Sequence, residues 1–124
     1  MILHLTDFSS EPLHEQISRQ VRAQILAGQL ADGDALPSIR ALARQEKVSV
    51  ITVQRAYDDL LREGPLVSRR GKVFFTAPIS QDQKRNTALE RLLKRLRVIV
   101  DEACAEGLDD AQIRRVVDQT MEEK

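Results

Sequence analysis

The sequence is poor in aromatic residues and in the side chains that build metal or redox sites. Aromatic residues make up 3% of the chain and tryptophan is absent. Proteins that grip single-stranded nucleic acid stack bases on several aromatic side chains, so that mode of binding is disfavoured. The single cysteine, Cys104, excludes an internal disulfide, and the two distant histidines, His4 and His14, do not form a metal site with it. We therefore expect no metal and no cofactor, and we expect Cys104 to be a small buried residue on a helix.

Long hydrophobic runs and an excess of one charge are also missing. No apolar run approaches the ~20 residues of a membrane-spanning helix, and the N-terminus MILHLTDF lacks the basic and hydrophobic regions of a signal peptide. These absences predict a cytoplasmic protein with no membrane partner. The 124 residues suit about one domain of ordinary size.

The charges balance over the whole chain, with 19 basic and 19 acidic residues, but they are unevenly spread. Residues 36–78 hold eight basic residues against four acidic ones, whereas acidic residues prevail before this segment. A DNA-binding surface would be sought in the basic middle segment. Taken alone, the bias also fits a solvated face of mixed charge.

A first amphipathic helix is predicted from Pro12 to about Ala27. Its apolar positions recur every four residues, at Leu13, Ile17, Val21 and Ile25. Gly28 can end this helix because glycine accepts the left-handed conformation of a C-terminal cap. Residues 29–34, which contain Asp-Gly, are predicted to form a turn.

Two shorter helices are predicted next, separated by a turn of about three residues. The first opens at Pro37-Ser38 and ends near Glu46, and the second begins after Ser49, a natural N-cap, and runs to Gly64. This arrangement matches the helix-turn-helix unit, whose second helix enters the major groove of DNA.

A β-hairpin is predicted after these helices, from residues 66–68 and 73–76, which are rich in β-branched and aromatic side chains. Its tip, Arg69-Arg70-Gly71-Lys72, carries three cations and a glycine. A basic hairpin tip is often only a solvated turn. Its place directly after a helix-turn-helix favours a wing that contacts phosphates and reaches toward the minor groove.

The C-terminal third has a different texture. Residues 79–83 are polar and linker-like, and apolar residues then follow helical spacing from Leu89 to Ala103 and again after Asp109, a predicted N-cap. Two helices can hardly bury these apolar stripes on each other, so a partner surface is needed. A second copy of the chain is the simplest partner. The alternative is that the helices fold back on the DNA-binding domain of the same chain.

Residues 12–78 resemble the winged-helix domain of the GntR family of bacterial regulators. The resemblance rests on Pro12-Leu13, Gln16-Ile17, Leu30, Gly33-Asp34, Leu36 to Arg40, Leu42-Ala43, Thr52-Val53, Ala56-Tyr57, Leu60, Glu63-Gly64 and Arg69 to Gly71. The short tail is similar to that of the YtrA subfamily, whose members are dimers built through two C-terminal helices. The implied fold is mainly α with a small β-hairpin: a winged helix-turn-helix domain at residues 10–78 and a two-helix dimerisation segment at 79–124.

The resemblance also implies which residues contact DNA. These are Ser38, Arg40, Ser49, Val50, Thr52, Gln54, Arg70 and Gly71. Their chemistry agrees with this role, because hydroxyl groups can donate to phosphates, Gln54 can pair with adenine, and Val50 can contact a thymine methyl.

Four residues depart from the family pattern. Lys47 occupies a turn position that is usually glycine, because the backbone at that position must take the left-handed conformation. Pro65 replaces an apolar residue at the start of the wing, and Val73-Phe74 replaces the usual Gly-Thr within it.

The residues and the resemblance together predict a transcription regulator, most simply a dimeric repressor bound to double-stranded DNA at a palindromic operator. An enzyme is not expected, since no converging set of acid, base and nucleophile is visible. A winged helix that binds protein or RNA is the alternative. An unknown small-molecule effector could bind at the dimer interface, or the protein could act without one.

Overall fold

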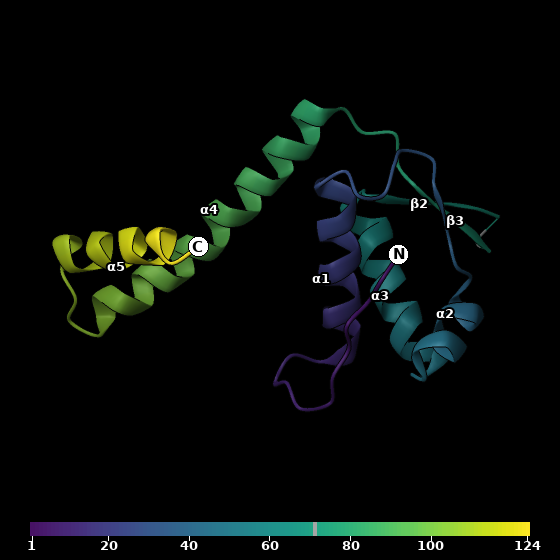
Figure 1. Ribbon diagram of the computed structural model, residues 1–124, viewed down its shortest axis with the longest axis horizontal. Coiled ribbons are helices and arrows are strands. Elements are labelled where there is room, and N and C mark those ends of the chain that lie inside the picture. The colour runs from purple at the N-terminus through teal and green to yellow at the C-terminus, as the bar shows by residue number, and fades with distance from the viewer. Residues whose placement is uncertain (71) are drawn as a thin grey trace. The chain divides into compact units, whose positions relative to one another are not determined.

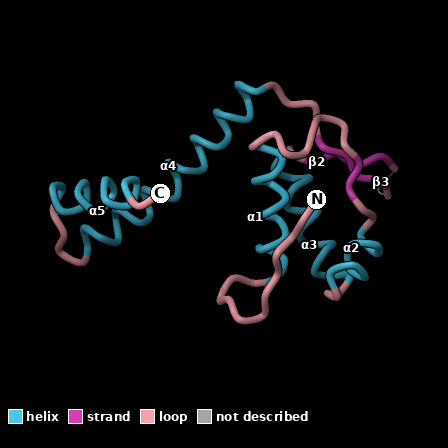
Figure 2. The backbone as a smooth tube through the Cα atoms, viewed as in Figure 1, coloured by secondary structure: helices cyan, strands magenta, loops and turns pink. Residues whose placement is uncertain are grey.

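The computed structural model describes residues 1–70 and 72–124, which divide into two compact units, Met1–Arg85 and Asn86–Lys124. The described residues form five helices and three short strands, so the chain is mainly helical, as predicted (Figures 1 and 2). No helix among them combines the length and the apolar character needed to cross a membrane.

The first unit contains three helices, three strands and the first turn of a fourth helix. They are α1 (Leu13–Leu26), β1 (Ala35–Leu36), α2 (Ile39–Glu46), α3 (Val50–Glu63), β2 (Leu66–Arg69), β3 (Val73–Thr76) and the start of α4 (Gln81–Ala105). The predicted helix-turn-helix and hairpin are confirmed. The sheet is antiparallel in the order β1-β3-β2, and Phe74 of β3 pairs with Leu36 on one side and Ser68 on the other. The sequence did not predict β1, because two residues are too few for an alternating pattern.

The core of this unit lies between α1, α3 and the sheet. The apolar stripe of α1 faces α3, and α2 and the sheet contribute the remaining side chains; the buried residues are Ile17, Val21, Ile25, Leu36, Leu42, Ala43, Val53, Ala56, Tyr57, Leu60, Leu66 and Phe74. The Tyr57 ring meets Phe74 edge to face with 4.8 Å between centroids. The Tyr57 hydroxyl donates to the carbonyl oxygen of Pro37 at 2.8 Å, which ties α3 to the residue that precedes α2.

The ends of α2 and α3 carry the caps that the sequence predicts. Ser38 accepts from the Ala41 amide and Ser49 accepts from the Thr52 amide, so each serine satisfies a donor in the first turn of its helix. Lys47 ends α2 with φ 57° and ψ 43°, the left-handed conformation expected at this turn position. Gly64 ends α3 with φ 111°.

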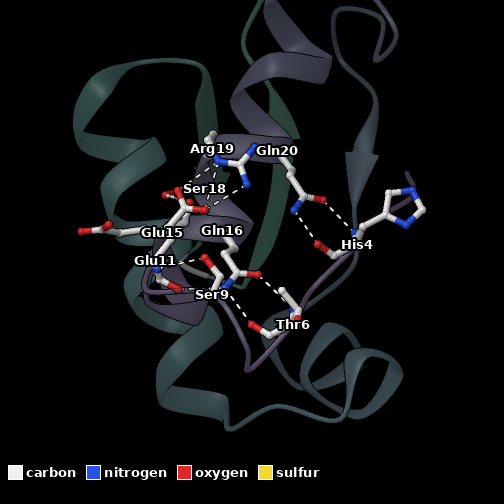
Figure 3. A network of polar contacts seen from close by, with 9 residues as sticks. All are labelled: His4, Thr6, Ser9, Glu11, Glu15, Gln16, Ser18, Arg19 and Gln20. Atoms are coloured by element: carbon white, nitrogen blue, oxygen red, sulfur yellow. Dashed lines mark hydrogen bonds and ion pairs between the residues drawn. The ribbon is translucent and has the colours of Figure 1, made fainter. Parts of the chain in front are cut away.

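An N-terminal strap, residues 1–11, lies along α1 and was not predicted. Gln16, Gln20 and Gln24, one helical turn apart, bond to the backbone of alternate strap residues (Figure 3 shows the first two). Leu3 and Leu5 occupy the residues between and pack against the core. Side-chain amides thus provide the pairing that a neighbouring strand would otherwise give.

Two ion pairs join distant parts of the first unit. Arg22 of α1 binds both carboxylate oxygens of Glu63 at the end of α3, with a shortest distance of 2.7 Å. Lys84, in the first turn of α4, donates from Nζ to Oδ1 of Asp32 at 3.0 Å, and its side chain is only 5% exposed. The Asp32 turn is itself held by Thr76, whose hydroxyl donates to the Ala31 carbonyl.

The start of α4 corrects the predicted linker at residues 79–83. The helix begins at Gln81, because Ser80 and Gln83 bond to each other's backbone amides. This is the reciprocal pattern of a capping box, a sequence signal that the polar composition of the segment obscures.

The second unit contains the remainder of α4 and α5 (Asp110–Glu122). Asp109 caps α5 in a capping box with Gln112, as its predicted role requires. Apolar side chains stay exposed on both helices; they include Leu89, Leu92, Leu93, Val98, Ile99, Val116, Val117 and Met121. Cys104 is also exposed on α4, so the prediction that it is buried was wrong. Its helical position is apolar by spacing, but no other part of the described chain covers it.

Candidate nucleic-acid interface

The exposed end of α3 is the centre of the candidate site. One face of this helix is buried in the core through Val53, Ala56, Tyr57 and Leu60. The opposite face presents Ile51, Gln54, Arg55 and Asp58, which recur at three- and four-residue spacing and are all exposed. Val50 lies beside them in the first turn. Two of the predicted base-reading residues, Val50 and Gln54, are therefore on the accessible part of this helix.

Ser49 and Thr52 act first as structural caps of α3. Their hydroxyl oxygens lie 2.7 Å apart, and Ser49 Oγ also accepts from the Thr52 amide. A hydrogen bond between two hydroxyls uses one of their two protons, so the other proton is left to donate. The pair can thus cap the helix and still offer one hydrogen bond to a phosphate.

Gln54 is oriented by a neighbour that the sequence analysis overlooked. Its Nε2 donates to Asp58 Oδ1, one turn along α3, at 2.9 Å. This bond uses one of the two amide protons and leaves the second proton and Oε1 available. An acceptor and a donor side by side are the groups that bind adenine in the major groove. The four-residue spacing of a glutamine and an aspartate on a helix is the signal that predicts such a bond.

The start of α2 places a second set of predicted residues. Ser38 caps the helix, and Arg40 lies exposed in its first turn. Arg44 is exposed one turn further along α2 and Arg55 is exposed on α3. Neither was predicted as a site residue, although the four-residue spacing of Arg40 and Arg44 indicates a shared helix face. Since α2 packs on α3, these cations belong to the same helix-turn-helix.

The hairpin carries the third set. Arg69 pairs with Val73 in the ladder, and its guanidinium carbon lies 5.6 Å from the centroid of the Phe75 ring. That cation–π contact anchors Arg69 to the sheet. Arg70 follows in a left-handed conformation, with φ 57°, and both Arg70 and Lys72 are exposed. Gly71 lies outside the described residues.

The departures in the wing have structural explanations. Phe74 is buried against Tyr57 and replaces a small wing residue with part of the core. Pro65 is buried too, and its carbonyl accepts from the Ala77 amide at 2.9 Å, so it keeps the acceptor half of this pairing at the start of β2 although it has no amide donor. In Figure 1, strands β2 and β3 lie on the same side of the first unit as α2 in that view.

The chemistry available at this surface is that of binding. Hydroxyl, guanidinium and amide donors surround the exposed apolar pair Val50 and Ile51 on α3. Such donors can bind phosphates and the polar edges of bases. In residues 1–70 and 72–124, no three histidine, cysteine, aspartate or glutamate side chains are grouped so that they could hold a metal ion. Within the second unit, α4 and α5 border an open groove of about 400 Å³, lined by Val100, Asp110, Ile113, Arg114, Val117 and Asp118.

Comparison with known proteins gives matches over the region that forms this surface. Residues 13–75 match the family described as "Bacterial regulatory proteins, gntR family". The chain is 41% identical over 69 residues to the uncharacterized HTH-type transcriptional regulator YhcF of Bacillus subtilis, and the matched region covers 56% of this chain and 57% of YhcF. It is 42% identical over 64 residues to the HTH-type transcriptional repressor YtrA of the same organism, with 52% and 49% covered. The chain thus spans about half the length of these two relatives.

A solved structure extends the likeness to nearly the whole chain. YtrA from Sulfolobus acidocaldarius, a GntR-family transcription factor, is 30% identical, with 98% of this chain and 97% of that chain covered and a TM-score of 0.58. The similarity therefore reaches beyond the helix-turn-helix into the helices that follow it.

Proposed function

This chain belongs to the GntR family of bacterial regulatory proteins, in its YtrA-like subfamily, and on that premise we propose that it is a dimeric repressor that binds a palindromic operator. Members of the family are transcription regulators with a DNA-binding domain, and its relatives here are regulators and not enzymes. The specific parts of the proposal are the contacts, the dimer and the symmetry of the operator.

The observation that carries the proposal is the exposed N-terminal half of α3. In a helix-turn-helix the second helix enters the major groove, where each base pair shows a distinct pattern of donors, acceptors and methyl groups. Val50 and Gln54 are exposed on that half of α3, and the buried core residues of this helix lie on its opposite face. We assign these two residues to base readout.

Phosphate contacts are assigned to the residues around this helix. Arg40 and Ser38 would bind the backbone from α2, and Ser49 and Thr52 from the start of α3. Arg70 would follow the groove from the hairpin, and Gly71 is assigned to the wing tip by its place in the sequence alone. The exposed cations Arg44 and Arg55 extend the same electrostatic footprint.

The domain assignment places DNA binding in residues 10–78 and dimerisation in residues 79–124. Support comes from the apolar side chains exposed on α4 and α5, because contiguous apolar patches mark interaction surfaces on proteins. A second copy of the chain is the proposed partner, and a two-fold dimer would bind two half-sites related by the same symmetry. The groove between α4 and α5 is where we place a small-molecule effector, which a change in melting temperature with candidate metabolites would reveal.

The test is selection of the purified protein against a randomised duplex pool at near-physiological salt. Enrichment of one palindrome, with affinity falling steeply as salt rises, is the expected result. Salt-sensitive binding without a preferred sequence would refute sequence-specific regulation. Absence of DNA binding would favour a winged helix that recognises protein or RNA, and sedimentation of the free protein as a monomer would refute the dimer.

A further inference from the structure

Ile51 is an apolar side chain at a position where it contributes little to the stability of the fold. It is 69% exposed in the first turn of α3, and Val50 beside it is 47% exposed. An isoleucine contributes to stability by leaving water, so a side chain this exposed forgoes that contribution. Isoleucine is also a weaker helix former than the straight-chain polar residues that usually cover such a face.

The position of Ile51 within the helix makes its exposure specific. Gln54 and Arg55 are three and four residues further along α3 and lie on the same face, opposite the buried Val53 and Tyr57. Ile51 is therefore in the middle of the polar face and is the exposed residue that precedes Gln54 on it. A solvated surface would favour a charged or amide side chain at this position.

One chemical group in the major groove matches an exposed branched apolar side chain. Thymine alone among the four bases presents a methyl group there, on C5, next to its O4 acceptor. Cytosine carries only a hydrogen at C5, and adenine and guanine have no methyl group at this edge. An isoleucine beside a glutamine thus combines one group that recognises a methyl with one that recognises an adenine edge.

We infer that Ile51 determines specificity by contacting the methyl group of one thymine in each half-site. Val50 beside it enlarges the apolar surface that faces this methyl group. The inference rests on the proposed function, since it requires α3 to lie in the major groove. It adds a residue and a base identity to that proposal. Recognition of methyl groups also explains why two neighbouring branched side chains occur at the end of an otherwise polar helix face.

The experiment replaces thymines of the selected operator, one symmetric pair at a time, by deoxyuracil, which differs only in lacking the methyl group. At one pair we expect the natural protein to lose about 15-fold in affinity, since each buried methyl gives roughly fourfold and the factors from the two half-sites multiply. Ile51→Ala should lose most of this difference and bind the thymine operator with nearly the affinity of the natural protein for the deoxyuracil operator. Ile2→Ala is the matched control, because Ile2 is 72% exposed on the N-terminal strap, and it should keep the full difference between the two operators.

Each outcome separates the inference from the proposal beneath it. A randomised pool that yields no preferred sequence would overturn the proposed function and the inference together. An operator in which every deoxyuracil replacement is neutral, or an Ile51→Ala protein that retains the full difference, would overturn the inference alone. Because Ile51 is exposed, its substitution should leave the melting temperature nearly unchanged, and a melting curve of each variant checks this.

Discussion

Gln20 holds the backbone of His4 at two points: its Nε2 donates to the His4 carbonyl at 2.8 Å and its Oε1 accepts from the His4 amide at 2.7 Å (Figure 3). Gln16 makes the same pair of bonds to Thr6 and a third to the carbonyl of Glu11. The two glutamines differ in their surroundings, since Gln16 is buried and Gln20 is partly exposed. The strap therefore depends on the buried glutamine more than on the accessible one.

Gln16→Ala should lower the free energy of unfolding by about 1–3 kcal/mol, because the partly buried backbone groups of Thr6 and Glu11 lose their partner. Gln20→Ala should cost less than about 1 kcal/mol, since water can replace its bonds. Urea denaturation measures both, with the exposed Gln29→Ala as the control. Equal losses for Gln16→Ala and Gln29→Ala would show that the strap contributes nothing to stability.

Asp32→Ala should destabilise the protein more than Lys84→Met. The first substitution leaves the buried Lys84 ammonium without the carboxylate that it binds, whereas the second removes the buried charge and keeps an apolar stem. We expect a loss of about 1–3 kcal/mol for Asp32→Ala and a change within about 1 kcal/mol for Lys84→Met. Thermal unfolding of the two variants decides the order, and the reverse order would contradict this account of the ion pair.

Stability should fall as the pH rises above about 10, the pKa of an unfolded tyrosine. Burial raises the pKa of Tyr57, so the folded protein retains a proton that the unfolded chain loses. The stabilisation is thus complete below that pH and declines above it. Tyr57 is the single tyrosine of the chain, so its ultraviolet absorbance reports its ionisation directly. Tyrosinate should appear together with unfolding. Ionisation near pH 10 in a chain that is still folded would contradict the prediction, and Tyr57→Phe should lack this part of the pH dependence.

Lys47→Gly should stabilise the protein by about 0.5–1 kcal/mol. Lys47 has a left-handed backbone, which strains any side chain with a Cβ and suits glycine. Lys47→Ala is the matched control, because it removes the charge and keeps the Cβ. A midpoint of denaturation for Lys47→Gly at or below that of Lys47→Ala would show that the turn carries no strain that glycine relieves.

Arg40→Ala and Gln54→Ala should affect DNA binding in different ways. Loss of a phosphate contact weakens binding to every duplex and lowers the salt dependence by about one unit of slope per protomer. Loss of a base contact relaxes the preference at one position of each half-site by about 1–3 kcal/mol. Binding isotherms at several salt concentrations separate the two, with the exposed Arg62→Ala at the far end of α3 as the control. Unchanged binding by Arg40→Ala would refute the proposed docking.

The helix-turn-helix was predictable because its signals are local. Ser38, Ser49 and Gly64 mark helix ends by their own chemistry, and the apolar spacing between them identifies the buried faces. The strap and β1 were not predictable in the same way. Their partners are distant in the sequence, such as Gln24 for Ile2 and Phe74 for Leu36, and no local pattern encodes those pairings. The burial of Lys84 was not predictable for the same reason, because it depends on the distant turn at Asp32, which Thr76 holds.

For the candidate site, the sequence located the exposed ends of α2 and α3 but not the interactions within them. The bond between Gln54 and Asp58 and the packing of Arg69 on Phe75 emerge only with side-chain geometry. The assignment of Ser38, Arg40, Ser49, Val50, Thr52, Gln54, Arg70 and Gly71 to DNA contact remains a prediction.

The central position of β3 in the sheet has a thermodynamic consequence for the proposed binding. Phe74 joins the hairpin to Leu36, and two residues later Ser38 caps the start of α2, so the sheet forms a frame that the hairpin and α2 share. Once Arg40 has bound a phosphate, the approach of Arg70 to the same duplex becomes an intramolecular step with a high effective concentration. The contacts of Arg40 and Arg70 should therefore strengthen each other, as in bivalent binding. Loosening the frame at Phe74 would therefore weaken DNA binding even though no contacting residue is changed.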